Sequence, residues 1–350
     1  MDWFQTDPKQ WAATQFGEAN LGDKRRTNRL LHLSEQVVGN PSGSFPDIPE
    51  CWADLKAAYR LFDAEEVTFQ AVATPHWHRT RACPPGRYLV IGDTTEFDWG
   101  PGVEGLAPTG REVTVAEYLE TLPVAGTFQL KLGARPKLPA RIAHLAVSFG
   151  PLRLLPPRLK SPYLKRLCPS PISMWVVRVR EVDPRPGVEP IEWVLYTSLP
   201  VETFEQAMVV VGYYEKRWLI EEWHKALKTG CQVEARQLEH HERLEAMVGL
   251  MSVIAVRLLQ LKAVARSEPD RPAEELVPRG YIRLLERARK MVPGTIQAVG
   301  QFFRGLAKLG GFLGRKGDGQ PGWITIWRGW DKLSLMLRGA ELTHEPAISP

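Results

Sequence analysis

Four polar side chains follow one another at spacings that place them on one side of a helix. They lie in the segment YYEKRWLIEEWHKALKTG and are Tyr214, Arg217, Glu221 and Lys228. At roughly 100° per residue, the other three lie within about 60° of Tyr214. We expect the opposite, apolar face around Trp223 to pack on a core. A carboxylate bracketed by two cations and a phenol suits a surface where a metal ion meets phosphates, and an ordinary solvated helix face is the alternative.

Other charged and aromatic residues extend this set. A basic cluster follows Gly22-Asp23 at what reads as a helix start, and it comprises Lys24, Arg25, Arg26 and Arg29. Such a cluster is either a solvated face or a contact surface for phosphates. Asp93 follows Tyr88–Ile91, a short apolar run typical of a buried strand. Trp193 lies in a strand-like segment, where packing in a core and stacking on a base are the two alternatives.

The composition sets wide bounds. A chain of 350 residues with 44% apolar residues suggests two or three domains with sizeable cores. The net charge of +5 and the pI near 9.0 permit a polyanionic partner without requiring one. Four scattered cysteines form no CxxC pair, which argues against a zinc site and for a reducing compartment. We also find no signal-like start and no apolar run of about 20 residues, so we expect a cytoplasmic protein.

The elements that must position these residues alternate along the chain. Residues 1–82 show helical spacing of apolar residues, with a break at Leu21-Gly22-Asp23. Strand-like runs separated by prolines follow at 126–132, 140–149, 174–182 and 192–199. The helical pattern returns from Val201 to about Ala265, and it continues over 273–350 with a glycine-rich interruption.

Beyond spacing, whole stretches of this sequence resemble one family. The signature segment and HERLEAMVGLMSVIAVRLLQLK downstream are similar to bacterial insertion-sequence DDE transposases with the Tyr-Arg-Glu-Lys signature, the transposon-five group. LGDKRRTNRLLHL, VIGDTTEFDW, EWVLYTSLPVET and LAKLGGFLGRKGDGQPGWITIWRGW resemble other parts of the same family. The resemblance implies an α/β fold, in which a ribonuclease-H-like core carries a β-rich insertion between N- and C-terminal helical domains.

The resemblance also implies domain boundaries. Residues 1–82 correspond to a helical domain that binds the transposon end. Residues 83–110 and 201–265 correspond to an incomplete ribonuclease-H-like catalytic core, and 111–200 to the β-rich insertion. Residues 266–350 correspond to a helical dimerisation domain. Double-stranded DNA is the implied partner, bound by a homodimer or by a heterodimer with a full-length relative.

Residue roles follow from the same resemblance. Asp93 and Glu221 match two of the three acids that hold two Mg²⁺ or Mn²⁺ ions for phosphodiester cleavage and strand transfer. The resemblance implies that Tyr214, Arg217 and Lys228 bind phosphates at the cleaved DNA end. It implies that Trp193 stacks on a flipped base. It also implies that the transposon end is contacted by Lys24, Arg25, Arg26 and Arg29.

One part of the family pattern is missing. Asp93 and Glu221 stand much closer in this sequence than the matching acids of the family, and the join falls near Gly110. The skipped block normally holds the second catalytic aspartate. The possible substitutes are poor: Glu96 and Asp98 lie too close to Asp93, Asp183 falls in a turn, and Glu222 points about 100° away from Glu221. We therefore expect an internally deleted transposase with crippled catalysis. A non-enzymatic regulator that dimerises with a full-length transposase, and a nuclease that completes its site from elsewhere, are the alternatives.

Overall fold

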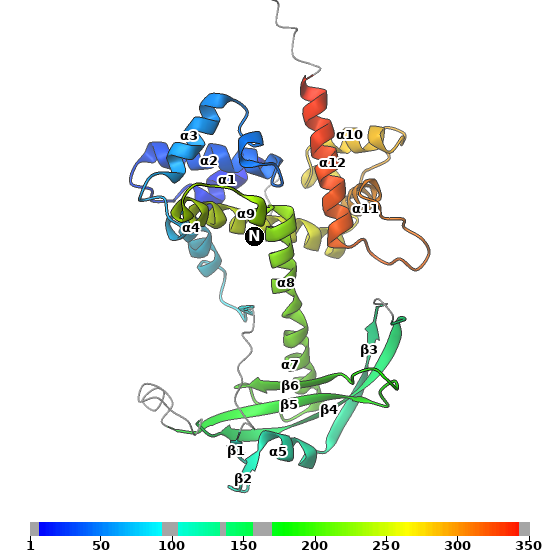
Figure 1. Ribbon diagram of the computed structural model, residues 1–350. Helices are drawn as coiled ribbons and strands as arrows, with labels where there is room; N and C mark the ends of the chain where they lie inside the picture. The colour runs from blue at the N-terminus through cyan, green and yellow to red at the C-terminus, as the bar shows by residue number, and fades with distance from the viewer. Residues whose placement is uncertain (1–6, 93–103, 134–137, 157–169, 343–350) are drawn as a thin grey trace, which may run out of the picture. The chain divides into compact units, whose positions relative to one another are not determined.

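The computed structural model describes residues 7–92, 104–133, 138–156 and 170–342. The chain forms two compact units (Figure 1). Residues 1–87 and 221–350 form one, here called the helical unit, and residues 88–220 form the other, the sheet unit. Helices and an antiparallel sheet together confirm the predicted α/β class.

The helical unit begins with four helices. They are α1 (Pro8–Phe16), α2 (Lys24–Gly39), α3 (Trp52–Phe62) and α4 (Phe69–Arg81). Side chains of Asp7, Asp23 and Thr68 cap α1, α2 and α4 by accepting hydrogen bonds from backbone N–H groups of the first turn. The predicted break between α1 and α2 is confirmed at Gly22, where φ is +74°. Glycine takes this left-handed conformation with little strain.

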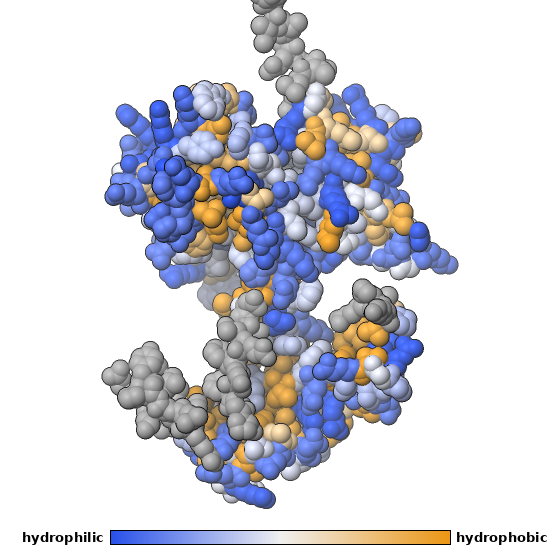
Figure 2. Space-filling view, in the orientation of Figure 1, coloured by the Kyte–Doolittle hydropathy of each residue, from blue (hydrophilic) through white to orange (hydrophobic). Residues whose placement is uncertain are grey.

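The rest of the helical unit is built on one long helix. The helices are α9 (His241–Ser267), α10 (Arg279–Ala288), α11 (Val299–Leu309) and α12 (Trp323–Leu342). α9 contacts α3 and α4 on the N-terminal side and α11 on the C-terminal side. Among the described residues, α9 alone is long and apolar enough to span a membrane, but 61% of its apolar window is buried within the protein. α9 therefore fits a core helix, and the visible surface of the helical unit is mostly hydrophilic in Figure 2.

α11 and α12 approach each other unusually closely at two glycines. A Cβ on Gly329 would lie 1.9 Å from the carbonyl oxygen of Leu306. A Cβ on Gly310 would lie 1.9 Å from the carbonyl oxygen of Thr325. Because real Cβ atoms do not come so close to backbone, this helix pair requires glycine at both positions.

The described residues of the sheet unit form six strands that pair antiparallel throughout. They are β1 (Glu104–Leu106), β2 (Glu112–Thr114), β3 (Val124–Leu132), β4 (Arg141–Leu154), β5 (Ile172–Val182) and β6 (Glu192–Thr197). Their order is β2-β1-β4-β5-β6, and β3 also pairs with β4. The four strands predicted from the proline-separated runs are confirmed as β3 to β6.

Each face of this sheet carries its own helix. α7 (Phe204–Lys216) packs on the face that holds Val177 and Val179, where Val211 completes an apolar cluster. α5 (Val115–Thr121) packs on the opposite face, against Val176. Residues alternate between the two faces along β5, because successive side chains of a strand point to opposite sides. α7 thereby anchors the start of the signature segment to the sheet (Figure 1).

The strand expected at Tyr88–Ile91 is wrong. These residues form no strand, and Val90 is 99% exposed. A short apolar run becomes a buried strand only when a neighbouring strand pairs with it and a second layer covers it. Neither neighbour is present for residues 88–91 within the described part of the chain.

Candidate nucleic-acid interface

The basic cluster occupies the first turns of α2. Asp23 caps this helix, accepting a hydrogen bond of 2.8 Å from the backbone N–H of Arg25. The first turn of α2 holds cations and no acidic residue. Cations at a helix N-terminus interact unfavourably with the helix dipole, and each destabilises the helix by about 0.3–1 kcal/mol. Lys24 and Arg25 are exposed, and neither has an ion-pair partner among the described residues. Their charge is therefore available to an external anion at a helix start, a common arrangement for binding phosphate.

Arg26 and Arg29 differ from Lys24 and Arg25 because the protein itself holds them. Arg26 donates to the carbonyl of Leu21 at 2.9 Å and pairs with Glu66 at 2.7 Å. Arg29 pairs with Asp54 of α3 at 2.6 Å. The structure thus divides the predicted cluster into two exposed cations and two whose charge is already balanced.

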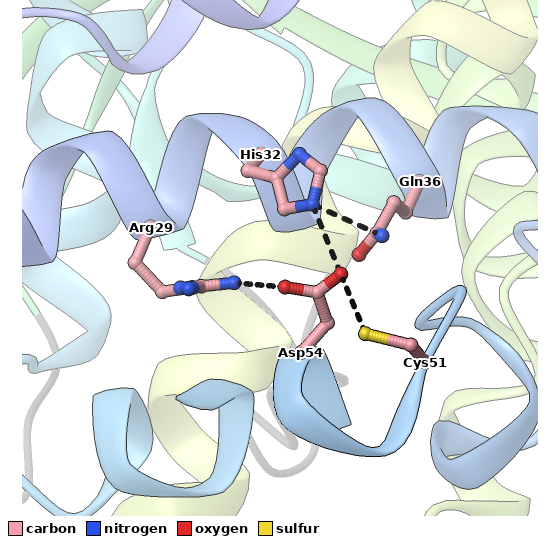
Figure 3. A network of polar contacts seen from close by, with 5 residues as sticks. All are labelled: Arg29, His32, Gln36, Cys51 and Asp54. Atoms are coloured by element: carbon pink, nitrogen blue, oxygen red, sulfur yellow. Dashed lines mark hydrogen bonds and ion pairs between the residues drawn. The ribbon is translucent and has the colours of Figure 1, made fainter. Parts of the chain in front are cut away.

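Asp54 lies at the centre of a polar network between α2 and α3 (Figure 3). Its carboxylate accepts from Arg29 and contacts His32 Nε2 and Cys51 Sγ, each at 3.4 Å. The hydrogen bond from Arg29 is the main reason why the pKa of Asp54 is lowered, against the opposing effect of burial. Asp54 thus remains a carboxylate at neutral pH and occupies the position on Arg29 that a phosphate oxygen would take. Nothing in the sequence of α2 indicates this partner, since it comes from the next helix.

Three of the signature and stacking residues come together in the sheet unit. The ring centroids of Trp193 and Tyr214 lie 5.2 Å apart, and the guanidinium of Arg217 lies 6.0 Å from the Tyr214 ring. Trp193 also packs beside the apolar cluster under α7. A half-buried tryptophan, a phenol and a guanidinium therefore lie next to one another, and side chains of these types can stack on bases and bind phosphates.

The uniform helix assumed for the signature segment is wrong. α7 ends at Lys216, α8 runs from Trp218 to Lys225, and a π-helical turn occupies Ala226–Gly230. A π-turn advances by less than 100° per residue, so the angle predicted for Lys228 does not hold. The predicted apolar face is confirmed from Trp223 onward, since Trp223 packs against the core of the helical unit and Ala226 and Leu227 are buried. It is wrong at Leu219, which is 45% exposed.

The signature residues are also divided between the two units. The boundary falls between Ile220 and Glu221, so Glu221 and Lys228 belong to the helical unit. Lys228 pairs with Glu234 at 2.9 Å, and this carboxylate raises the pKa of the Lys228 ammonium. Glu221 is half-buried in α8.

A metal site cannot be built from the described residues alone. Asp93, the first expected acid, lies outside them. Within them, no group of three His, Cys, Asp or Glu side chains is placed to hold a metal ion. Glu222, beside Glu221, is engaged by the buried Lys262 of α9. The described residues by themselves therefore do not form a two-metal centre.

Sequence reasoning missed a buried arginine that joins distant segments of the helical unit. Arg236 is 7% exposed and donates to the carbonyls of Cys231 at 2.8 Å and Pro41 at 2.7 Å. It also donates to the carbonyl of Gly43. Burial lowers the pKa of Arg236, and no carboxylate among the described residues pairs with it. In the described part of the chain this guanidinium donates only to backbone carbonyls, and a pattern of charged residues cannot predict such partners.

Two segments of the chain match known protein families. Residues 8–67, which include α1, α2 and α3, match the model of the transposase DNA-binding domain. Residues 253–347, from within α9 to beyond α12, match the model of the Tn5 transposase dimerisation domain. The exposed cations of α2 thus lie inside the first match, and the close contact of α11 with α12 lies inside the second.

Proposed function

We propose, because both ends of the chain belong to the Tn5 type of insertion-sequence transposases, that the protein binds transposon-end DNA as a dimer. One observation carries this proposal. The DNA-binding and dimerisation segments are far apart in sequence but fold into one compact unit around α9. A single folded body can therefore hold the DNA end and a second subunit together, in the cytoplasm of a bacterium.

End binding is assigned to two sets of residues. Lys24 and Arg25 contact phosphates through the start of α2, with Arg26 and Arg29 beside them. Tyr214, Arg217 and Lys228 hold phosphates nearer the cleaved end, and Trp193 stacks on a base. Affinity should fall steeply with salt, because each neutralised phosphate releases counterions.

The same ancestry implies cut-and-paste transposition, that is, metal-dependent phosphodiester cleavage and strand transfer. We propose that this activity is crippled in this chain. Asp93 and Glu221 would hold Mg²⁺ or Mn²⁺, but the second aspartate of the family is missing from the sequence. With two acids, a two-metal clamp on the scissile phosphate is incomplete. The proposal is therefore a transposase-lineage protein with an internally shortened ribonuclease-H-like core, which retains end binding and has crippled catalysis.

A regulator of a full-length transposase is the second candidate. The contacts around α9 favour it, since the unit that carries both matched segments has its own apolar core. Such a protein would occupy transposon ends and form mixed dimers, and it needs no catalytic centre to do so.

A gel-shift assay on the element's ends, run beside a cleavage assay with Mg²⁺ or Mn²⁺, tests both candidates. We expect end-specific binding and no metal-dependent cleavage. The Lys24→Gln, Arg25→Gln double variant should bind end DNA more weakly. Arg283→Gln, which removes an exposed positive charge from α10, serves as the control. Inhibition of an intact relative in trans would favour the regulator.

Two results would overturn these assignments. Cleavage that disappears in Asp93→Ala or Glu221→Ala would show that the shortened chain still runs the metal chemistry. Equal affinity for end and unrelated DNA, unaffected by the Lys24 and Arg25 changes, would remove the end-binding function.

A further inference from the structure

A pocket of about 300 Å³ opens in the helical unit, well away in sequence from α2 and Tyr214. It lies between the end of α9, the start of α11 and the loop before α12. Three cations line it: Lys262 and Arg266 from α9, and Arg304 from α11. The volume is at the lower end of the range for small-ligand sites.

The charges in this pocket are only partly balanced by the described residues. Asp270 is the one carboxylate in the lining, within the described residues. Lys262 is buried and already engaged by Glu222. Arg266 and Arg304 are exposed, and neither has an ion-pair partner in the described part of the chain.

The state of Lys262 reflects this excess of positive charge. Burial lowers its pKa most, the hydrogen bond from its ammonium to Glu222 raises it, and the nearby charge of Arg266 lowers it again. Lys225 adds a further lowering effect. An anion in the pocket would relieve the repulsion between these cations.

The start of α11 adds to the same field. Ala298 and Gly300 line the pocket, so the positive end of the α11 dipole faces it. The backbone N–H of Gly300 already donates to Pro269, and α11 therefore contributes its field rather than free donors. Phe303 and Ile326 form an apolar wall of the pocket.

We propose that this pocket binds a phosphate group, with Arg266 and Arg304 as its direct ligands. Guanidinium groups suit phosphate because their planar fork gives two parallel hydrogen bonds. Lys262 supplies charge from behind, and the apolar wall accepts the sugar to which the phosphate is attached. The source is either a phosphodiester of bound DNA or a free nucleotide, since both present the same group.

Binding of inorganic pyrophosphate to the full chain tests the pocket without DNA. Isothermal calorimetry and thermal denaturation should both detect binding at millimolar concentration. The Arg266→Gln, Arg304→Gln double variant should lose the heat signal and the rise in Tm. Arg283→Gln removes an exposed arginine of α10 outside the pocket and should keep both.

DNA binding by the same variants identifies the source of the phosphate. This arm rests on the proposed function, whereas the pyrophosphate arm does not, so the two can fail separately. If a DNA phosphodiester occupies the pocket, the double variant should bind end DNA several-fold more weakly, with a salt slope smaller by about 1. Unchanged DNA affinity with loss of dAMP binding would assign the pocket to a free nucleotide. Pyrophosphate binding equal in wild type and double variant, or absent from both, would overturn the proposal.

Discussion

Trp193 of β6 and Tyr214 of α7 meet with their ring centroids 5.2 Å apart and their planes inclined by 52°. The tilted contact is a favourable geometry for two aromatic rings. It fixes the last turn of α7 on the sheet, directly before Arg217. The two rings therefore have a structural role whether or not DNA is bound.

This contact should appear as a coupling energy between the two positions. In a double-mutant cycle with Trp193→Ala and Tyr214→Ala, we expect about 0.5–1.5 kcal/mol of interaction free energy. Urea denaturation followed by circular dichroism measures it. Val194→Ala, on the opposite face of β6, should show no coupling to Tyr214→Ala. Strictly additive losses for Trp193 and Tyr214 would contradict the contact.

Removing the carboxylate of Asp54 should release Arg29 for phosphate. We expect Asp54→Asn to bind DNA several-fold more tightly. The slope of log K against log salt concentration should become steeper by about 1, the value for one additional phosphate contact. Asp63→Asn changes net charge equally but removes the partner of Arg243 instead. A fluorescence anisotropy titration compares them, and an equal gain in Asp63→Asn would indicate a general charge effect.

The Asp54 pair should also give stability a defined pH dependence. Its folded pKa lies below the ordinary value of 3.8, so the unfolded state binds more protons in acid. The stabilisation is full above the unfolded pKa and is lost as pH falls through the folded pKa. Because the pair is partly exposed, we expect at most about 1 kcal/mol. Wild type should exceed Asp54→Asn at pH 6, and the difference should vanish in acid; a difference that persists would be inconsistent with this origin.

Substitution of the buried Arg236 should lower the stability of the protein strongly. Arg236→Lys cannot reach all three carbonyls with one ammonium, and each buried acceptor left unsatisfied costs about 1–3 kcal/mol. We expect the free energy of unfolding to fall by about 2–4 kcal/mol. Arg243→Lys, which changes a more exposed ion pair, should alter it by less than about 1 kcal/mol. Similar small effects for both variants would show that the carbonyl cluster is easily rehydrated.

Two glycines of α12 should respond oppositely to alanine. Gly329→Ala places a methyl group against the Leu306 carbonyl, so α11 and α12 must separate. We expect a lower Tm and weaker dimerisation in sedimentation experiments. Gly339→Ala meets nothing within 4 Å and should be neutral or stabilising by up to about 1 kcal/mol. If Gly329→Ala assembled like wild type, the close approach would not be required.

Local patterns predicted the regular elements well. The strand-like run at 174–182 identifies β5, because the residues of that strand that face α7 are buried and must be apolar. Gly22-Asp23 identifies the start of α2, because a left-handed glycine and a capping aspartate are local requirements. Such features depend on a few neighbouring residues and can be predicted from the sequence.

Features that depend on distant partners were predicted poorly. Tyr88–Ile91 has strand-like residues but lacks a pairing strand in the described chain. The signature segment has helical spacing throughout, yet it is interrupted at Arg217 and again by the π-turn before Cys231. Asp54 and Arg236 act on groups from other segments, and no periodicity indicates such contacts.

The helical unit is assembled from the first and last parts of the chain, with consequences for biosynthesis. The segment that ends near Arg87 leaves the ribosome long before α9 is made. At roughly 5–20 residues per second, the wait is on the order of ten to thirty seconds. During that time the apolar side chains that later pack on α9, such as Val72, lack the part of their packing that α9 supplies. The nascent N-terminal segment therefore exposes apolar surface during synthesis, and it completes its packing only after α9 has been made.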